Sequence, residues 1–233
     1  MKRSLNFSII IPIYNEFENI INLFNELKEN LKNYNDFEII FVNDGSTDSS
    51  QKILDNLNPN DNFRLTIIVN NKNYGQSYSI YKGAQKSQFD NLITIDGDGQ
   101  NDPKDINKLI EIYFKDPDIV LVGGIRKKRK DTISKKLSSI IANKVRSFIL
   151  KDKCEDTGCS LKIFEKKILL SFNYFDGIHR FLPALFSTKN KKIVFVDVNH
   201  RYRIFGKSKY NNINRFIRGV KDLVKVYKII NRL

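Results

Sequence analysis

The chain has 233 residues, a formal charge of +14 and a hydrophobic fraction of 41%, which suits one α/β domain with a sizeable core. No apolar run approaches the roughly 20 residues that a membrane-spanning helix needs. The short run after Met1 is broken by Pro12, so we expect the first strand of a cytoplasmic protein and not a leader peptide. The two His and two Cys residues follow no zinc-ligand spacing, and Walker and Gly-x-Gly-x-x-Gly loops are missing. This argues against zinc proteins, P-loop hydrolases and hydride-transfer enzymes.

The positive charge is concentrated in two blocks of the sequence. The segment from Arg126 to Lys153 has eleven Lys or Arg residues against two Asp, and the segment from Arg201 to Leu233 has ten against one. Such blocks attract phosphate-bearing partners, namely nucleotides, lipid phosphates, an anionic membrane face or nucleic acid. The alternative is a merely solvated surface, because Lys is common there.

Buried-strand and amphipathic-helix patterns alternate through the first half of the chain, which indicates a mostly parallel, doubly wound α/β sheet. Ser46 or Thr47 is expected to cap the second helix. Strands are expected at Phe7–Ile13, Phe37–Val42, Leu65–Val69, Asn91–Ile95 and Ile119–Val122, the last ending at Gly123-Gly124, and helices at Glu16–Leu31, around Ile53–Leu57, at Gln76–Lys86 and after Pro103.

Two basic amphipathic helices are expected in the second half of the chain, from Ile133 to Ile149 and over residues 211–233. A basic amphipathic helix can lie in a membrane interface, and packing of its apolar stripe on the domain or on a second subunit is equally compatible with the pattern. Between the helices, Cys159–Phe164 and Lys192–Val198 are expected to be strands of a mixed or antiparallel edge. We therefore divide the chain into a catalytic domain at 1–210 and a C-terminal helix at 211–233.

A pair of acidic residues, Asp96 and Asp98, directly follows the central strand. Ligands bind at the carboxyl ends of strands in open α/β sheets, and Mg²⁺ or Mn²⁺ takes carboxylate oxygens as ligands. A solvated Asp-Gly turn is the alternative for this motif alone. An EF-hand calcium loop is excluded, because Asn101 and Asn107 occupy the positions that require Gly and Glu.

Several other strand ends should meet at the same edge of the sheet. They carry Tyr14 and Glu16 after the first strand, Asp44 after the second, and the stretch Asn73-Tyr74-Gly75-Gln76 after the third. Asp44 could accept a hydrogen bond from a nucleotide base, or it could simply start a helix. The convergence is stronger support for a ligand site than any single turn.

An ordered set of motifs resembles the family 2 inverting glycosyltransferases with the GT-A fold, over roughly Phe7 to Tyr210. The set is Ile-Pro-Ile-Tyr-Asn-Glu, Val-Asn-Asp-Gly-Ser-Thr-Asp, Asn-Tyr-Gly-Gln and Asp-Gly-Asp-Gly-Gln-Asn-Asp-Pro. Further motifs are similar to the polyprenyl-phosphate glycosyltransferase branch, which includes dolichyl-phosphate mannose synthase. They are Arg126-x-x-Arg129, Asp156-Thr157-Gly158-Cys159, His179-Arg180-Phe181-Leu182 and Arg203-x-x-Gly206-x-Ser208-Lys209-Tyr210.

The resemblance implies roles for individual residues. Nucleotide binding falls to Pro12, Tyr14, Glu16, Asp44, Gln76 and Asp96, and Mg²⁺ or Mn²⁺ binding to Asp96, Asp98 and Gln100. Phosphates of the donor or acceptor would meet Arg126, Arg129, Arg203, Ser208 and Lys209, and Asp98, Asp156 and Arg126 are the candidate catalytic residues. Asp156 would orient the acceptor or act as base, although a structural Asp is equally plausible, and we expect His179 to be structural.

The implied reaction moves a sugar from a UDP- or GDP-sugar to a polyprenyl phosphate, with inversion, at the cytoplasmic membrane face. Many bacterial members of the branch carry two transmembrane helices after the catalytic domain; others rely on a partner protein or an interfacial helix, and a homo-oligomer is a further option. Two alternatives remain, a soluble family 2 transferase with a saccharide acceptor and, more distantly, a nucleic-acid-binding module.

Overall fold

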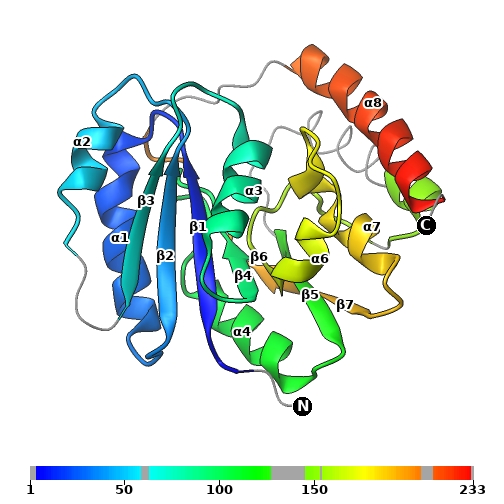
Figure 1. Ribbon diagram of the computed structural model, residues 1–233, viewed down its shortest axis with the longest axis horizontal. Helices are drawn as coiled ribbons and strands as arrows, with labels where there is room; N and C mark the ends of the chain where they lie inside the picture. Colours follow the sequence, from blue (N-terminus) through cyan, green and yellow to red (C-terminus); the bar gives the residue numbers. More distant parts are fainter. Residues whose placement is uncertain (1–3, 59–62, 127–144, 153, 206–211, 232–233) are drawn as a thin grey trace.

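The fold is built on a twisted sheet, seen in Figure 1. The computed structural model describes residues 4–58, 63–126, 145–152, 154–205 and 212–231, and for 212–218 the backbone only. In this part the strands follow the order β3-β2-β1-β4-β6-β5-β7, and β6 runs antiparallel to both of its neighbours. The strands are β1 (Phe7–Ile13), β2 (Phe37–Asn43), β3 (Arg64–Val69), β4 (Asn91–Thr94), β5 (Ile119–Arg126), β6 (Lys162–Glu165) and β7 (Lys192–Val198). The expected α/β class with a mostly parallel sheet is confirmed.

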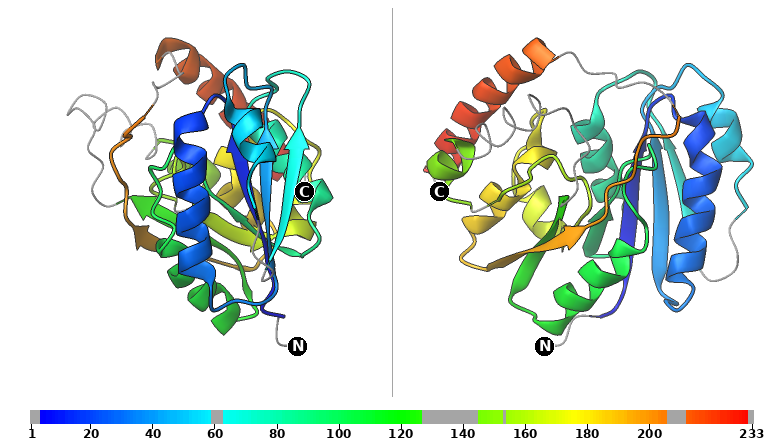
Figure 2. Two further views of the ribbon diagram at one scale, coloured as in Figure 1. Left: turned by 90° about the vertical axis from the view of Figure 1, so that its left-hand side faces the viewer. Right: turned by 180° about the vertical axis from the view of Figure 1, so that it is seen from behind.

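Helices cover both faces of this sheet, as Figure 2 shows for α1 and α4 on one side and α3 on the other. The helix α8 lies at the end of the molecule farthest from α1 and α2. The helices are α1 (Phe17–Leu31), α2 (Ser50–Asp55), α3 (Gln76–Lys86), α4 (Asp105–Lys115), α6 (Lys166–Leu170), the 3₁₀ turn η1 (Ile178–Arg180), α7 (Leu182–Ser187) and α8 (Asn212–Ile230).

The core has two parts because β1 is buried on both faces. Ile9 and Ile11 pack in the cluster under α1 and α4, whereas Ile10 packs in the cluster under α3, α6 and α7. Side chains alternate between the faces of a strand, so an uninterrupted apolar run is what a strand between two helical layers requires. β1 is thereby fixed in the middle of the sheet, with its carboxyl end beside those of β2 and β4.

The strand β5 is longer than the sequence indicates. It continues through Gly123 and Gly124 to Arg126, where we expected the glycines to end it. A Cβ at Gly123 would lie 3.1 Å from the ring of Phe195 in β7, and a Cβ at Gly124 would lie 2.9 Å from Cys159 Sγ. The glycines therefore allow close packing inside the sheet, and they carry Arg126 to its edge.

The expected cap of α2 is wrong, because the helix begins at Ser50 and neither Ser46 nor Thr47 caps it. The N–H of Ser50 donates to Asp48 Oδ1 at 2.9 Å. Ser46 Oγ instead accepts the N–H of Asn15 at 3.0 Å, and the N–H of Thr47 donates to the Asn15 side chain at 2.7 Å. These polar groups tie the end of β1 to the end of β2.

The two basic segments are described only in part. Most of the helix expected from Ile133 to Ile149 lies outside the described residues, although 145–150 are helical. The C-terminal segment forms α8 over most of its length, and the domain boundary near 210 also lies outside the described part. Among the residues searched, no helix has the length and hydrophobicity to cross a membrane.

Candidate functional site

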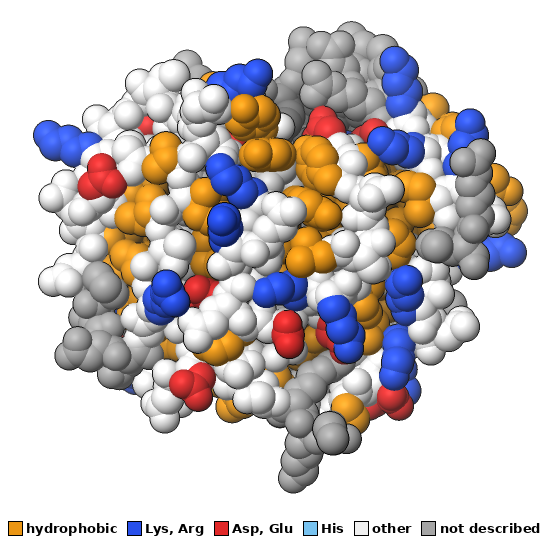
Figure 3. Space-filling model, viewed as in Figure 1, with side chains coloured by type: hydrophobic (Ala, Val, Ile, Leu, Met, Phe, Trp, Pro, Cys, Tyr) orange, Lys and Arg blue, Asp and Glu red, His pale blue; other side chains and the backbone are white. Residues whose placement is uncertain are grey.

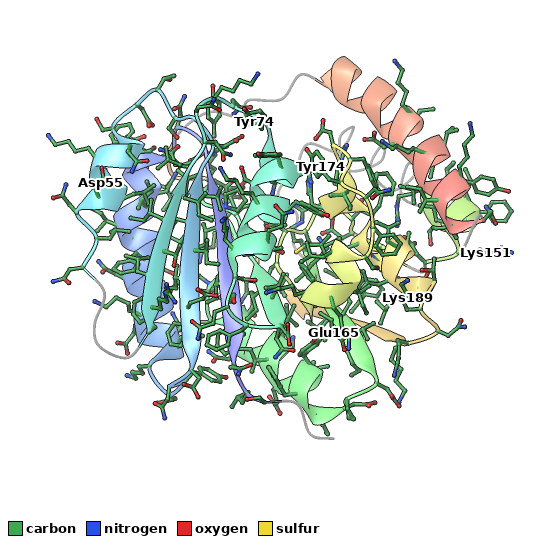
Figure 4. All side chains as sticks on the ribbon, viewed as in Figure 1. Asp55, Tyr74, Lys151, Glu165, Tyr174 and Lys189 are labelled. Atoms are coloured by element: carbon green, nitrogen blue, oxygen red, sulfur yellow. The ribbon has the colours of Figure 1, made fainter. Side chains whose placement is uncertain are left out.

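A cleft of about 260 Å³ opens at the carboxyl ends of β1, β2 and β4. In Figure 4 this edge is the upper one, where Tyr74 is labelled. The cleft brings together residues from five separate stretches of sequence, four of which are the strand ends that were predicted to converge, and Arg203 is the fifth. It is lined by Pro12, Ile13, Tyr14, Glu16, Asp44, Asn73, Gly75, Gln76, Asp96, Gly97, Asp98 and Arg203.

The two acids after β4 are placed by a close approach of backbone segments. A Cβ at Gly97 would lie 2.3 Å from Ile13 Cδ1 and 3.0 Å from the carbonyl oxygen of Pro12. Only glycine therefore lets the turn after β4 pack against the end of β1. Asp96 and Asp98, on either side of Gly97, both face the cleft.

Both carboxylates are held in an environment that disfavours their charge. Burial, and then the charge of Asp98, raise the pKa of Asp96 to about 6, although Lys162 and Arg126 partly offset this effect. Burial also raises the pKa of Asp98. Two acids whose negative charge is destabilised in one cleft form a site that a cation would stabilise.

Arg203 supplies positive charge in the cleft, next to the acids. Its guanidinium forms an ion pair with Glu16 and lies 4.0 Å from Asp98 Oδ2, and its Nε donates to the carbonyl oxygen of Phe205 at 3.0 Å. Glu16 is itself fixed by a bond from its N–H to Ser50 Oγ, at 3.0 Å. Arg203 lies about 190 residues from Glu16 in sequence, so the sheet edge and the chain after β7 both contribute to the cleft.

The cleft suits a divalent cation that arrives with a phosphate ligand. Within the described residues there is no group of three or more His, Cys, Asp or Glu residues that could hold a metal ion alone. Mg²⁺ is usually bound through one or two carboxylates together with substrate phosphates and water, and Asp96 and Asp98 provide that number. Gln100 does not line the cleft and its amide lies 3.4 Å from the carbonyl oxygen of Arg201, so its predicted role as a ligand stays a prediction.

Asp44 is buried and already has three hydrogen-bond donors. Its Oδ1 accepts from Asn70 Nδ2 at 2.7 Å and from the N–H of Tyr74 at 3.0 Å, and its Oδ2 accepts from the N–H of Gly75 at 2.7 Å. Asp44 thus shapes the loop before α3. A carboxylate has about four acceptor sites, so contact with a nucleotide base stays a prediction for the remaining one.

The next residue, Gln76, connects this loop to the acids. Its Nε2 donates to Asp96 Oδ1 at 2.6 Å. Because Gln76 is the first residue of α3, the start of that helix fixes one face of the Asp96 carboxylate.

Arg126 and Asp156 form an ion pair that does not line the cleft. Arg126 Nε and Nη2 each donate to a different oxygen of Asp156 at 2.7 Å, and the N–H of Arg126 adds a third bond at 3.2 Å. A Cβ at Gly158 would lie 2.7 Å from Arg126 Nη2. Asp156 thus holds Arg126 in place, as the structural alternative expects, and a role of Asp156 toward the acceptor or as a base stays a prediction.

The remaining predicted site residues fall into two groups. Pro12, Tyr14, Glu16 and Gln76 line the cleft as expected, whereas Arg129, Ser208 and Lys209 lie outside the described residues.

The sequence reasoning missed Lys162, which is buried in β6, and whose charge lowers the pKa of Asp96. The position of this lysine inside the otherwise apolar run Leu161–Phe164 could have indicated that its charge acts on a buried group.

Comparisons with known proteins agree with this geometry. The model of the family "Glycosyl transferase family 2" matches residues 8–172. An undecaprenyl-phosphate 4-deoxy-4-formamido-L-arabinose transferase from Pectobacterium carotovorum is 32% identical over 207 residues, which are 88% of this chain and 63% of that protein. A dodecaprenyl-phosphate galacturonate synthase from Rhizobium johnstonii is 33% identical over 229 residues, 96% of this chain and 67% of that protein. The chain thus spans about two-thirds of the length of these relatives.

Solved structures show the same fold. One is glucosyl-3-phosphoglycerate synthase from Mycobacterium tuberculosis, in complex with Mn²⁺, UDP and glucosyl-3-phosphoglycerate. It superposes with a TM-score of 0.72 at 13% sequence identity, and the match covers 97% of this chain and 79% of the other. Mannosyl-3-phosphoglycerate synthase from Rubrobacter xylanophilus gives a TM-score of 0.74 at 12% identity, with 98% of this chain and 75% of the other covered. By fold this is a GT-A structure, and the chain belongs to glycosyl transferase family 2.

Proposed function

We propose that the protein transfers a sugar from a UDP- or GDP-sugar to a polyprenyl phosphate, with inversion at the anomeric carbon. The observation that carries the proposal is the pair Asp96 and Asp98, which line one cleft and whose pKa values are raised by burial. A bound cation would stabilise their negative charge. The acceptor is supported by the relatives above, which are named for undecaprenyl and dodecaprenyl phosphate.

In this reaction Asp96 and Asp98 would hold Mg²⁺ or Mn²⁺. When bound, the cation neutralises charge on the departing nucleoside diphosphate. Pro12, Tyr14 and Asp44 would then bind the nucleoside, because they line the same cleft.

Arg126 would bind a phosphate with donors that Asp156 already orients. A guanidinium held by one carboxylate is less mobile and can grip a phosphate with two donors. Arg203 has a related role at the cleft itself, where binding of a diphosphate would replace its bond to Glu16.

A strong general base is unnecessary for such an acceptor. The second ionisation of a phosphate ester lies near pH 6, so the attacking oxygen already carries charge at neutral pH. This agrees with the ion pair of Asp156, whose oxygens both accept from Arg126. Because the acceptor is a lipid, the protein would work peripherally at the cytoplasmic face of a membrane.

The test is incubation with radiolabelled UDP- and GDP-sugars, undecaprenyl phosphate and Mn²⁺. We expect label in the organic phase, and none with the Asp98→Ala variant. Label that stays in the aqueous phase with every donor would contradict the lipid acceptor. Transfer to an added saccharide would show that the acceptor is a saccharide.

A further inference from the structure

The apolar face of the helix α8 is wider than the part that packs on the domain. Val226 is fully buried, and Leu223 and Ile230 are partly buried against the same core cluster. Beside them on the helix surface, Val220, Val224 and Tyr227 are each about half exposed, at 47%, 50% and 49%. Their spacing of four and three residues places them on one face, and we call them the outer stripe. They are not among the described side chains that pack against the two core clusters.

The charged side chains around the outer stripe are positive. Lys221, Lys225 and Lys228 are exposed, and Figure 3 shows Lys and Arg side chains along the upper right, where α8 lies. Asp222 is the one acidic residue between 219 and 231, and its side chain pairs with Arg180. Apolar side chains flanked by lysines complement an anionic lipid surface, in which the apolar groups insert and the lysines meet lipid phosphates.

A second helix presents the same kind of surface. In the helix at 145–150, Phe148 is 84% exposed and Val145 is 51% exposed. The last residue of this helix, Leu150, packs in the same core cluster as Val226 of α8. Both basic segments therefore place exposed apolar side chains on elements that share one part of the core.

The inner side of α8 is bonded to the turn η1. Arg180 Nη2 donates to Asp222 Oδ2 at 2.6 Å, and both side chains are mostly buried. Gly177, at the start of the turn, has φ of +91°, and a Cβ there would lie 2.6 Å from Asp222 Oδ2. The backbone of the turn thus lies directly against the helix, and a displacement of α8 would move it.

The same turn holds the first turn of α3. The N–H of Gly177 donates to Ser77 Oγ at 2.8 Å, and His179 Nδ1 lies 2.5 Å from the same oxygen. Ser77 is fully buried. Its neighbour Gln76 bonds Asp96 at 2.6 Å, so an unbroken series of contacts joins α8 to the acids of the cleft.

We propose that α8 is a membrane-docking helix that positions the nucleotide cleft. Its outer stripe binds an anionic bilayer. The Asp222–Arg180 pair and the Ser77–His179 contact couple the position of α8 to the positions of Gln76 and Asp96. Asp222, Arg180, Ser77 and His179 are thus positioning residues, and bilayer binding tightens the binding of the nucleoside diphosphate. The inference rests on the proposed function for the identity of the ligand.

The experiment measures the Kd of UDP with saturating Mn²⁺ by calorimetry, with vesicles of phosphatidylcholine alone and of phosphatidylcholine with phosphatidylglycerol. We expect anionic vesicles to lower the Kd by about fivefold or more. Because coupling between two binding events is reciprocal, UDP with Mn²⁺ should increase the affinity for these vesicles by the same factor in sedimentation. A merely structural role of the contacts would not produce this reciprocity.

Two variants separate docking from coupling. Val224→Asp should lose vesicle binding and keep the vesicle-free Kd, because Val224 is half exposed and does not line the cleft. Asp222→Asn should bind vesicles like the wild type but show no vesicle effect on the Kd. Ser77→Ala should reproduce that loss of coupling, so that a folding defect of one variant does not decide the result.

Several results would overturn the inference. A wild-type Kd that is the same with both vesicle types overturns it, as does full coupling in both Asp222→Asn and Ser77→Ala. Dimerisation that Val224→Asp abolishes, without binding of wild type to vesicles, would assign the outer stripe to a second copy of the chain. Failure of the wild type to bind UDP, or GDP in its place, under any condition would instead overturn the proposed function.

Discussion

The two ends of the same strands each carry a polar hollow, and the two hollows are of comparable size. The hollow at the amino ends of β1 and β4 measures about 330 Å³ and the cleft at the carboxyl ends about 260 Å³. Glu165, labelled in the lower half of Figure 4, belongs to the hollow at the amino ends. This hollow is lined by Ser4, Asn6, Gln88, Phe89, Asp90, Asn91, Glu165 and Lys167.

The difference between the two hollows is charge. At the amino end, Glu165 lies 3.3 Å from Lys167, and the side-chain amide of Asn91 donates to the carbonyl oxygen of Asn6 at 2.8 Å. At the carboxyl end, four acids, Glu16, Asp44, Asp96 and Asp98, share the lining with one base, Arg203. Two acids whose charge is disfavoured by burial, Asp96 and Asp98, mark a ligand site better than volume does.

The largest effect should come from removing one acid of the cleft. We expect Asp98→Ala to reduce sugar transfer by about 10³-fold or more, because the cleft then loses one of the two carboxylates that we propose hold the cation. Transfer should be measured with excess Mn²⁺, alongside circular dichroism to verify the fold. An Asp98→Ala protein with near-normal turnover would remove the basis for treating the two hollows differently.

A smaller loss is expected for Arg126→Lys, about 10²-fold in turnover. Lysine keeps the charge but cannot bond both oxygens of Asp156 and a phosphate with a planar fork. Arg64→Lys is the matched control, because Arg64 bonds Gln88 at 3.3 Å on an exposed edge. Equal activity of both variants would show that Arg126 serves only the packing of its loop.

The cation affinity of the cleft should depend on pH. Asp96, with a pKa of about 6 in the metal-free protein, must lose its proton before it binds Mn²⁺. Below this pH the affinity should therefore fall by up to about tenfold per pH unit. Calorimetric titration of the protein with Mn²⁺ in the presence of UDP, between about pH 5 and 7, measures this affinity. An affinity that does not change over this pH range would disprove the predicted competition between the proton and the cation.

Replacing Asp96 should increase stability while it removes function. Its pKa is raised from 3.8 to about 6 in the folded state, so its contribution to stability is complete below pH 3.8 and is lost as the pH rises through 6. Asp96→Asn should therefore stabilise the metal-free protein by about 2 kcal/mol at neutral pH and much less near pH 4. Urea unfolding at the two pH values tests this, and equal stabilisation at both would contradict it.

The smallest effect is expected at the amino-end hollow. Glu165→Gln breaks the ion pair with Lys167, whose side chain is 77% exposed, so stability should change by less than about 1 kcal/mol. Sugar transfer and nucleotide affinity should be unchanged. A clear loss of either would mean that this hollow also takes part in function.

The alternation of strands and helices and the positions of the acids of the cleft follow from the amino-acid sequence. Asp44, Asp96 and Asp98 each follow an apolar run that can only be a buried strand, and the carboxyl ends of parallel strands lie at one edge. Both features depend on neighbours in sequence, so local patterns were sufficient to predict them.

Tertiary structure alone decided which distant residues complete the site. It inserted β6 antiparallel between β4 and β5, joined Arg203 to Glu16 and Arg126 to Asp156, and set Asp222 of α8 against Arg180. No local pattern specifies these pairs, because each depends on strand order, on glycines that allow close packing and on the burial of both partners. The amphipathic pattern predicted that α8 is a helix, and only packing showed which part of its apolar face the domain covers.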